Sequence, residues 1–154
     1  MYRIVVKGIV QGVGFRPFIY REAVARGITG YVRNIGDGVE ILSSDKKLLD
    51  VLDRAPPLAV IEDVSIEEVG GVYTDFTIRE SRGVSREINI PPDVAVCMDC
   101  LREMKNMGDR RYRYYFTTCT NCGPRYTMIE DFGRSYDRET TSMRDFEMCV
   151  DCRR

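Results

Sequence analysis

Residues 2–16 read Tyr-Arg-Ile-Val-Val-Lys-Gly-Ile-Val-Gln-Gly-Val-Gly-Phe-Arg, a β-branched run followed at once by a glycine-rich turn. The run predicts a strand over residues 2–8, because β-branched side chains suit a pleated, half-buried surface. The turn leads into a helix that continues to about Arg26, with Pro17 in its first turn and Gly27 as its C-terminal cap. Phe15, Ile19 and Ala23 recur every four residues, so they should form the buried face of that helix.

The rest of the first 90 residues continues this alternation of strands and helices. Further strands are predicted over 28–34 and 39–42, then a short helix over 45–53 capped by Asp45, and two closing strands over 61–69 and 76–78. With the two closing segments taken together as the last strand, the order β, α, β, β, α, β predicts an α+β fold, a ferredoxin-like split βαβ sandwich. We expect four mostly antiparallel strands with two helices on one face.

The glycine-rich turn is also a candidate anion site. Between a strand and a helix N-terminus, several main-chain N–H groups can converge where the helix dipole is positive. The candidate groups are Gln11, Gly12, Val13, Gly14, Phe15 and Arg16, and the Arg16 guanidinium can add two parallel hydrogen bonds to a phosphate. Glycines also occur in such turns for conformational reasons alone. The hypothesis requires that the guanidinium is not ion-paired away from the turn.

All six cysteines lie in the last 60 or so residues, as three Cys-x-x-Cys pairs. Eighteen residues separate the first pair, Cys97 and Cys100, from the second, Cys119 and Cys122, a spacing typical of a structural four-thiolate zinc site. The third pair, Cys149 and Cys152, supplies only half of a second site. Two copies of the chain could complete it in a dimer, or the thiols could be oxidisable. Because the first 90 residues contain no cysteine, the sequence predicts one domain at 1–90 and a zinc-finger region at 91–154 with its second finger truncated.

The composition narrows the choice of function. The chain has no histidine or tryptophan, which excludes histidine-based catalysis and histidine metal ligands. The alternative of a disulfide framework suits secreted domains, but no signal peptide or long apolar run is evident, so we expect a cytoplasmic, thiol-reduced protein without a membrane span.

Binding to nucleic acid is a further alternative, because basic and aromatic residues alternate from Arg110 to Phe116. Against it, residues 1–90 hold 12 basic and 13 acidic residues and residues 91–154 hold 11 of each, so neither part has the positive excess of a generic nucleic-acid binder. The same side chains can instead cover a small metal site.

The stretch from Gly8 to Arg16 resembles the acylphosphatase signature, Gly-x-Val-Gln-Gly-Val-Gly-Phe-Arg. Gly30-Tyr31-Val32-Arg33-Asn34 and Asp37-Gly38-Val39-Glu40 are similar to the family's second conserved stretch. The resemblance implies the acylphosphatase fold, with Arg16 binding the phosphate of an acyl phosphate and Asn34 orienting the attacking water. The competing interpretation is that Asn34 only supports the adjacent turn.

The cysteine region resembles the zinc-finger region of the HypF carbamoyltransferase family of [NiFe]-hydrogenase maturation. The similarity lies in Arg110-Arg111-Tyr112-Arg113-Tyr114, in Cys119-Thr120-Asn121-Cys122-Gly123-Pro124-Arg125-Tyr126, in Tyr136-Asp137-Arg138 and in Thr140-Thr141-Ser142-Met143. An acylphosphatase domain followed by this region is the family's N-terminal architecture. The resemblance implies zinc, carbamoyl phosphate as substrate and a HypE-like protein as partner.

Two functions follow from these resemblances. The first is a truncated HypF-like enzyme that binds and hydrolyses carbamoyl phosphate or another acyl phosphate, the first step of carbamoyl transfer, since the later domains of the family do not fit in 154 residues. The alternative is a non-catalytic adaptor that binds a maturation partner through its zinc module.

Overall fold

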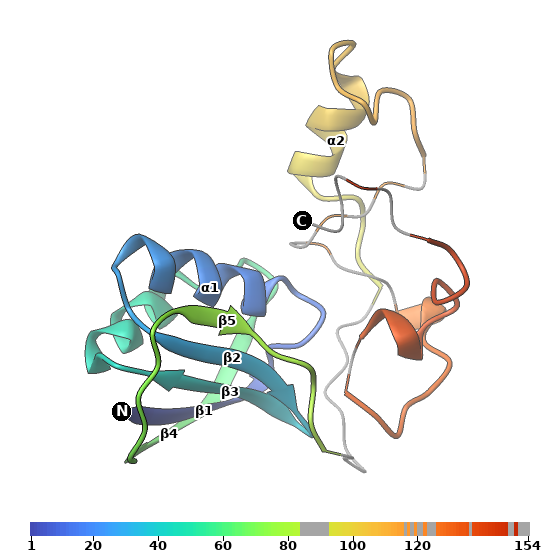
Figure 1. The fold of residues 1–154 in the computed structure, drawn as a ribbon. Coiled ribbons are helices and arrows are strands. Elements are labelled where there is room, and N and C mark those ends of the chain that lie inside the picture. Colours follow the sequence, from blue (N-terminus) through green and yellow to red (C-terminus); the bar gives the residue numbers. More distant parts are fainter. Residues whose placement is uncertain are drawn as a thin grey trace.

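Five strands form a single sheet in the order β4-β1-β3-β2-β5 (Figure 1). The structure is a computed structural model that describes residues 1–83, 93–115, 117, 119, 122, 126–135, 137–147 and 150. Its first part contains β1 (Tyr2–Ile9), α1 (Phe15–Ala25), β2 (Gly30–Ile35), β3 (Gly38–Ser43), the 3₁₀ segment η1 (Lys46–Arg54), β4 (Val60–Glu68) and β5 (Phe76–Ile78). Its second part contains α2 (Met98–Lys105) and the short 3₁₀ turns η2 (Tyr126–Met128) and η3 (Arg138–Thr140).

The predicted fold class is confirmed, with two differences in detail. The sheet has five strands rather than four, because the closing segments predicted at 61–69 and 76–78 form two separate strands on opposite edges, β4 beside β1 and β5 beside β2. The β2–β5 pair is parallel, and the other strand pairs are antiparallel. The segment predicted as a helix from Asp45 forms tight 3₁₀ turns, capped by the Asp45 side chain, which accepts a hydrogen bond from Lys47 N at 2.9 Å. The predicted domain boundary at residue 90 lies outside the described residues.

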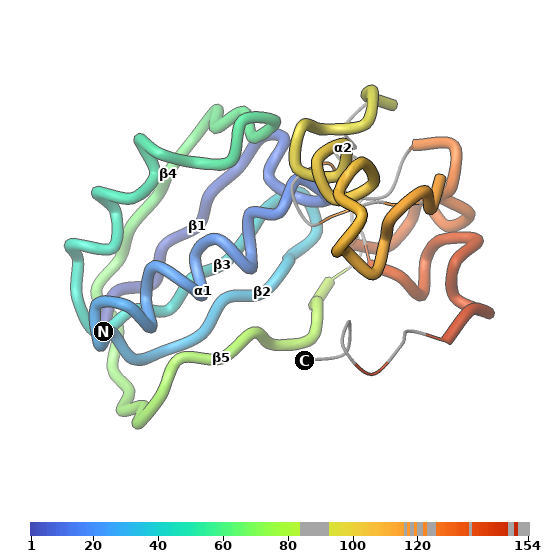
Figure 2. Tube along the Cα trace, turned by 90° about the horizontal axis from the view of Figure 1, so that it is seen from above, coloured from blue at the N-terminus to red at the C-terminus, as the bar shows by residue number. Residues whose placement is uncertain are grey.

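Both helical segments cover the same face of the sheet, and the hydrophobic core lies between the two layers (Figure 2). Phe15, Ile19 and Ala23 of α1 are buried, as their spacing predicts. They pack in one cluster with alternate residues of the central strands, including Ile4, Val6, Val32, Val39 and Ile41. Replacing Phe15 by alanine should therefore cost about 3–5 kcal/mol in the free energy of unfolding.

Strand β4 is only partly covered because it lies at the edge of the sheet. Val64 and Ile66 pair with Val6 and Ile4 of β1, which places them on the core-facing side, yet 38% and 40% of their surface stays exposed. The alternation that predicted this strand is real, but the helical layer does not extend over it.

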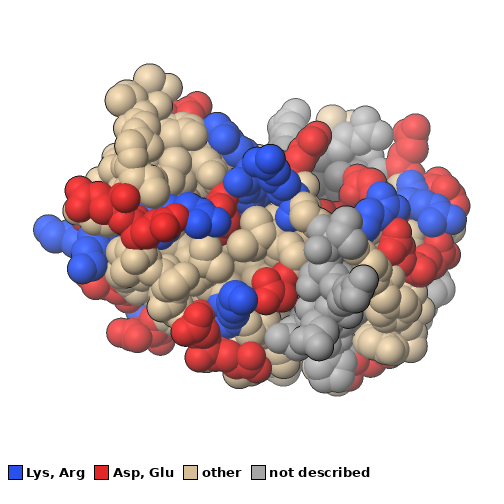
Figure 3. Space-filling view, turned by 90° about the horizontal axis from the view of Figure 1, so that it is seen from below, with Lys and Arg blue, Asp and Glu red and all other residues tan. Residues whose placement is uncertain are grey.

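The opposite face of the sheet is not covered by any helix of the described residues (Figure 1) and carries charged side chains of both signs (Figure 3). At its centre the buried carboxylate of Glu40 accepts hydrogen bonds from Arg3 Nε at 2.7 Å, Arg33 Nε at 2.7 Å and the Tyr31 hydroxyl at 2.8 Å. Burial opposes its ionisation, but these three donors outweigh that cost and hold the pKa of Glu40 below its usual value.

Candidate phosphate-binding loop and four-cysteine metal centre

The loop between β1 and α1 is shaped by glycine geometry at both ends. The β1–β4 pairing shifts register between Lys7 and Gly8, and a Cβ at Gly8 would lie 2.2 Å from the Val60 carbonyl oxygen. Only glycine therefore fits this bulge, after which β1 pairs with β4 for two more residues and ends at Ile9, just before the loop. Gly14 has a φ of 77° and caps the helix N-terminus, which leaves main-chain N–H groups of the first turn available to a ligand.

Gln11 ties this loop to the turn between β2 and β3. Its buried side-chain nitrogen donates to the carbonyl oxygens of Ile35, Gly36 and Gly38 at 3.1, 3.2 and 2.8 Å. The side chains of Val13 and Phe15 lie in the core, at 0% and 1% exposure. These loop residues can therefore offer an anion only their main-chain N–H groups, and that role remains a prediction.

Asn34 lies in β2 on the helix-covered face of the sheet, since it alternates with Val32 of the core. Its side chain is fully buried. The Gln11 contacts to the residues that follow Asn34 bring the loop over this end of the strand. The position is compatible with an amide that orients a water beside the loop, and also with a structural role for the turn.

Arg16 is the second residue of α1, and both of its terminal nitrogens have partners. Nη2 donates to Asp137 Oδ1 at 2.8 Å, and Nη1 lies 3.4 Å from the hydroxyl oxygen of Ser81. The phosphate hypothesis requires that this guanidinium is not ion-paired away from the turn, so the carboxylate supplied by the second part of the chain counts against it unless a ligand displaces Asp137. A ligand anion at this guanidinium has to contend with Asp137.

Sequence reasoning missed both Ser81 and Asp137. Ser81 follows β5 and is positioned by main-chain bonds that extend the strand, Arg79 N to Val32 O and Arg82 N to Asn34 O, each at 2.9 Å. Asp137 is 121 positions from Arg16, and no sequence periodicity connects the two. The Tyr136-Asp137-Arg138 similarity marked the segment but gave no contact.

The four cysteines of the first two pairs converge on one point. Cys97 is the N-cap of α2 and Cys100 lies in its first turn, while Cys119 and Cys122 come from the segment that returns to it. All four sulfur atoms lie within 4.8 Å of one another. None of these thiols is in a disulfide, so the disulfide interpretation is wrong for this part of the chain.

The distances between these sulfur atoms fit a single tetrahedral ion. Cys97 and Cys119 sulfurs lie 3.4 Å apart, Cys100 and Cys122 3.7 Å, and Cys119 and Cys122 3.8 Å. A metal–sulfur bond of about 2.3 Å in a tetrahedral site gives sulfur–sulfur edges of roughly 3.8 Å. The cluster is therefore a metal-binding centre by geometry and donor type, with two half-exposed and two buried thiols.

Burial raises the pKa of the Cys100 thiol. Burial also opposes ionisation of Cys97, but hydrogen bonds from the Cys100 main chain and the Cys119 thiol lower the pKa of Cys97 below the usual value. A thiolate at a helix N-terminus also benefits from the helix dipole. A bound divalent cation compensates several thiolates at once, which explains how buried sulfurs can be held so close together.

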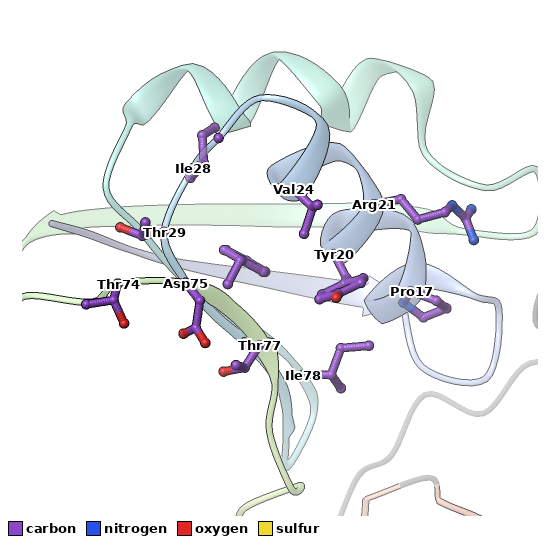
Figure 4. Close-up of a pocket in the computed structure, with 12 residues that line it drawn as sticks. Pro17, Tyr20, Arg21, Val24, Ile28, Thr29, Thr74, Asp75, Thr77 and Ile78 are labelled. Atoms are coloured by element: carbon purple, nitrogen blue, oxygen red, sulfur yellow. The ribbon is translucent and has the colours of Figure 1, made fainter. Parts of the chain in front are cut away.

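A shallow groove of about 800 Å³ runs between α1 and β5 (Figure 4). Tyr20, Val24 and Ile78 line it, with Asp75 at its rim. It contains none of the predicted site residues.

The comparisons with known proteins agree with this geometry. Residues 2–78 match the acylphosphatase family, and they make up half of the chain. The chain belongs to the acylphosphatase family. Residues 96–129 match the HypF finger, so the acylphosphatase domain and the cysteine centre both have family counterparts.

Individual relatives show both parts together. The probable carbamoyltransferase HypF of Methanocaldococcus jannaschii is 51% identical over 147 residues, which covers 89% of this chain and 19% of that protein. The crystal structure of full-length HypF in its phosphate- and nucleotide-bound form is 42% identical and superposes with a TM-score of 0.85, over 99% of this chain and 21% of that one. An acylphosphatase of Caldivirga maquilingensis is 50% identical over 86 residues, which covers 50% of this chain and 90% of its own length.

The chain thus corresponds to the acylphosphatase-and-finger part of HypF carbamoyltransferases, as its motifs predict. It spans about a fifth of the length of the HypF relatives it matches. Cys149 and Cys152, to which the predicted half-site and dimer belong, lie outside the described residues. Among the described helices, none has the length and apolar character that crossing a bilayer requires.

Proposed function

We propose that the acylphosphatase domain binds and hydrolyses carbamoyl phosphate or a related small acyl phosphate, with the phosphate held by Arg16 and the main-chain N–H groups of residues 11–16. One observation supports it above the others: a complete signature loop with left-handed Gly14 leads into α1, and its arginine sits in the first turn. The relatives named as acylphosphatases and as HypF carbamoyltransferases support the substrate class.

The chemistry needs only positioning and charge stabilisation. Water adds to the phosphorus of the bound acyl phosphate, the phosphorus–oxygen bond to the acyl group breaks, and the acyl group leaves as its carboxylate, or as carbamate. Because the leaving group is good, donors aimed at the phosphoryl oxygens can suffice without a covalent nucleophile. Asn34 orients the water in this scheme.

The cysteine centre supplies structure rather than chemistry. We infer that Cys97, Cys100, Cys119 and Cys122 bind zinc, because four thiolates at tetrahedral distances are the preferred set for a structural Zn²⁺ site. Reduced thiols of this kind suit the cytoplasm. We therefore propose two units, residues 1–90 with the phosphate loop and residues 91–154 with the cysteine centre.

The experiment is phosphate release from acetyl phosphate and carbamoyl phosphate. The unmodified chain should accelerate both above the uncatalysed rate, and Arg16→Ala should lower kcat/KM by at least about 100-fold. Arg21→Ala removes an exposed arginine from the same helix and serves as the matched control, with activity unchanged. No acceleration by the unmodified chain would refute the enzymatic assignment.

A second candidate function is docking to a maturation protein such as a HypE-like partner. It is favoured by the apolar and aromatic side chains that the second part exposes, among them Tyr115 at 76%, Phe146 at 62% and Met107 at 81%. Arg111 of the basic and aromatic stretch is ion-paired with Glu103, which reduces the charge available for nucleic acid. In the docking case, Arg16→Ala would leave partner capture unchanged.

A further inference from the structure

The ion pair between Arg16 and Asp137 joins the two parts of the chain at the predicted phosphate site. In Figures 1 and 2 the second part lies beyond the end of the sheet where α1 begins. Arg16 comes from the first turn of that helix, and Asp137 precedes η3. The side chains are 23% and 25% exposed, so the pair is partly shielded from water.

Asp137 is held in place by its own surroundings. Its main-chain N–H donates to Thr140 Oγ1 at 3.2 Å and its side chain accepts from the Thr140 main-chain N–H, which together form a capping box. The Thr140 hydroxyl also donates to the Asp137 carbonyl oxygen at 2.7 Å. Thr140 O in turn accepts from Glu130 N at 2.9 Å, and the neighbouring Thr141 bridges Ile129. The carboxylate is therefore presented by an ordered unit and not by a loose side chain.

A phosphate and this carboxylate compete for the same donors. A guanidinium binds an oxyanion best through two parallel N–H groups, but one terminal nitrogen of Arg16 faces Asp137 and the other faces Ser81. A phosphate dianion on those nitrogens would also lie within a few ångströms of the carboxylate, where two like charges repel.

We propose that Asp137 is an internal anion that occupies Arg16 when no phosphate is bound, and that binding of the substrate phosphate displaces it and loosens the contact between the finger region and the loop. The inference rests on the proposed function, since it assumes that phosphate binds at Arg16. It makes Asp137 a residue that sets phosphate affinity without touching the reacting atoms. Phosphate binding and the contact between the finger region and the loop are thereby coupled, so that each weakens the other.

The test measures the dissociation constant for inorganic phosphate by calorimetry in the full chain. Asp137→Asn removes the charge and keeps a good N-cap, so phosphate should bind about three- to tenfold more tightly, the value expected when a partly exposed ion pair no longer competes. The control is Asp145→Asn, which changes the net charge equally in the same region at a side chain that is 81% exposed, and should leave the affinity unchanged.

Hydrogen exchange gives an independent readout of the coupling. In the unmodified chain, phosphate should speed exchange of the amides in residues 126–147, whereas in Asp137→Asn exchange should be fast already and respond little to phosphate. Asp137→Ser, which also caps but does not reach Arg16, should behave like Asp137→Asn.

The outcomes separate the two proposals. Equal or weaker phosphate affinity in both Asp137 variants, with binding lost in Arg16→Ala, would overturn the competition while leaving the phosphate site standing. Absence of phosphate binding to the unmodified chain, or binding that survives Arg16→Ala, would instead overturn the proposed function on which this inference rests.

Discussion

The side chain of Gln11 donates a buried hydrogen bond of 2.8 Å to the main-chain carbonyl of Gly38. The loop that carries the phosphate hypothesis is thereby attached to the hairpin that carries Asn34, so the shape of one depends on the other. Two more carbonyls of the same turn accept from the same nitrogen. The contact is structural, but it fixes how far the loop lies from Asn34. It therefore also fixes the distance between a bound phosphate and a water oriented by Asn34.

Replacing Gln11 with leucine should therefore affect stability and activity together. The buried carbonyls lose their donor, which costs about 1–3 kcal/mol in the free energy of unfolding. Chemical denaturation measures this loss. Gln11→Glu is the matched variant of equal size, and it should destabilise at least as much at neutral pH, because a carboxylate cannot donate to a carbonyl. A leucine variant as stable as the original chain would contradict the role given to Gln11.

Asn34→Ala should lower kcat for acyl phosphate hydrolysis by about 100-fold with little change in KM, if the amide orients water and does not hold the phosphate. Steady-state kinetics with acetyl phosphate separates the two parameters. The dissociation constant for inorganic phosphate serves as the control and should not change. If KM and the phosphate affinity weaken instead while kcat is retained, Asn34 supports the turn and takes no part in the reaction.

Loss of the metal should unfold the finger region and leave the sheet intact. Clustered thiolates repel one another without a cation, and binding energy at such a site is folding energy. A chelator, or Cys100→Ser, should abolish one equivalent of bound zinc and remove protection from exchange around α2. The amides of β1 and β3 should stay protected as the internal control. Retention of α2 protection after complete metal removal would show that the centre is not structural.

The stability of the first part should depend on pH through Glu40. Burial opposes ionisation of Glu40, but hydrogen bonds from Arg3, Tyr31 and Arg33 lower its pKa in the folded state. Its contribution to stability is therefore fully present above the unfolded pKa of about 4.3 and is lost as the pH falls through the lower, folded pKa. Glu40→Gln should cost about 2 kcal/mol at pH 7 and progressively less below about pH 4. Urea unfolding at several pH values measures the difference. A constant difference between pH 3 and pH 7 would contradict this assignment.

Glu67→Gln is the control for this prediction. Glu67 also pairs with Arg3, but its side chain is 56% exposed, so the substitution should cost little stability.

Local patterns predicted the first part of the fold well. The spacing of Phe15, Ile19 and Ala23 identified the buried face of α1, and β-branched runs identified all five strand segments within two residues at each end. Where the prediction was incomplete, the missing information was tertiary. The parallel pairing of β5 with β2 and the partial exposure of Val64 depend on where a strand lies in the sheet.

The candidate sites show the same division. Cys-x-x-Cys spacing was sufficient to predict the metal centre, because two short loops can meet around one ion in few ways. The partner of Arg16 could not be predicted, since the pairing with Asp137 depends on how the finger region sits against the loop. Likewise, the motif predicts Gln11 as a phosphate-binding group, which stays a prediction for its main-chain N–H, but it gives no sign that the side chain bonds to the β2–β3 turn.

Nuclear magnetic resonance with inorganic phosphate tests the central claim at the level of individual atoms. On titration, the main-chain amides of Gly12, Gly14 and Phe15 and the guanidinium Nε–H of Arg16 should shift together along one saturable curve, and Arg16→Ala should remove that curve. Saturable shifts confined to other residues, or a loop that does not respond while Arg16 stays paired with Asp137, would contradict phosphate binding at this site.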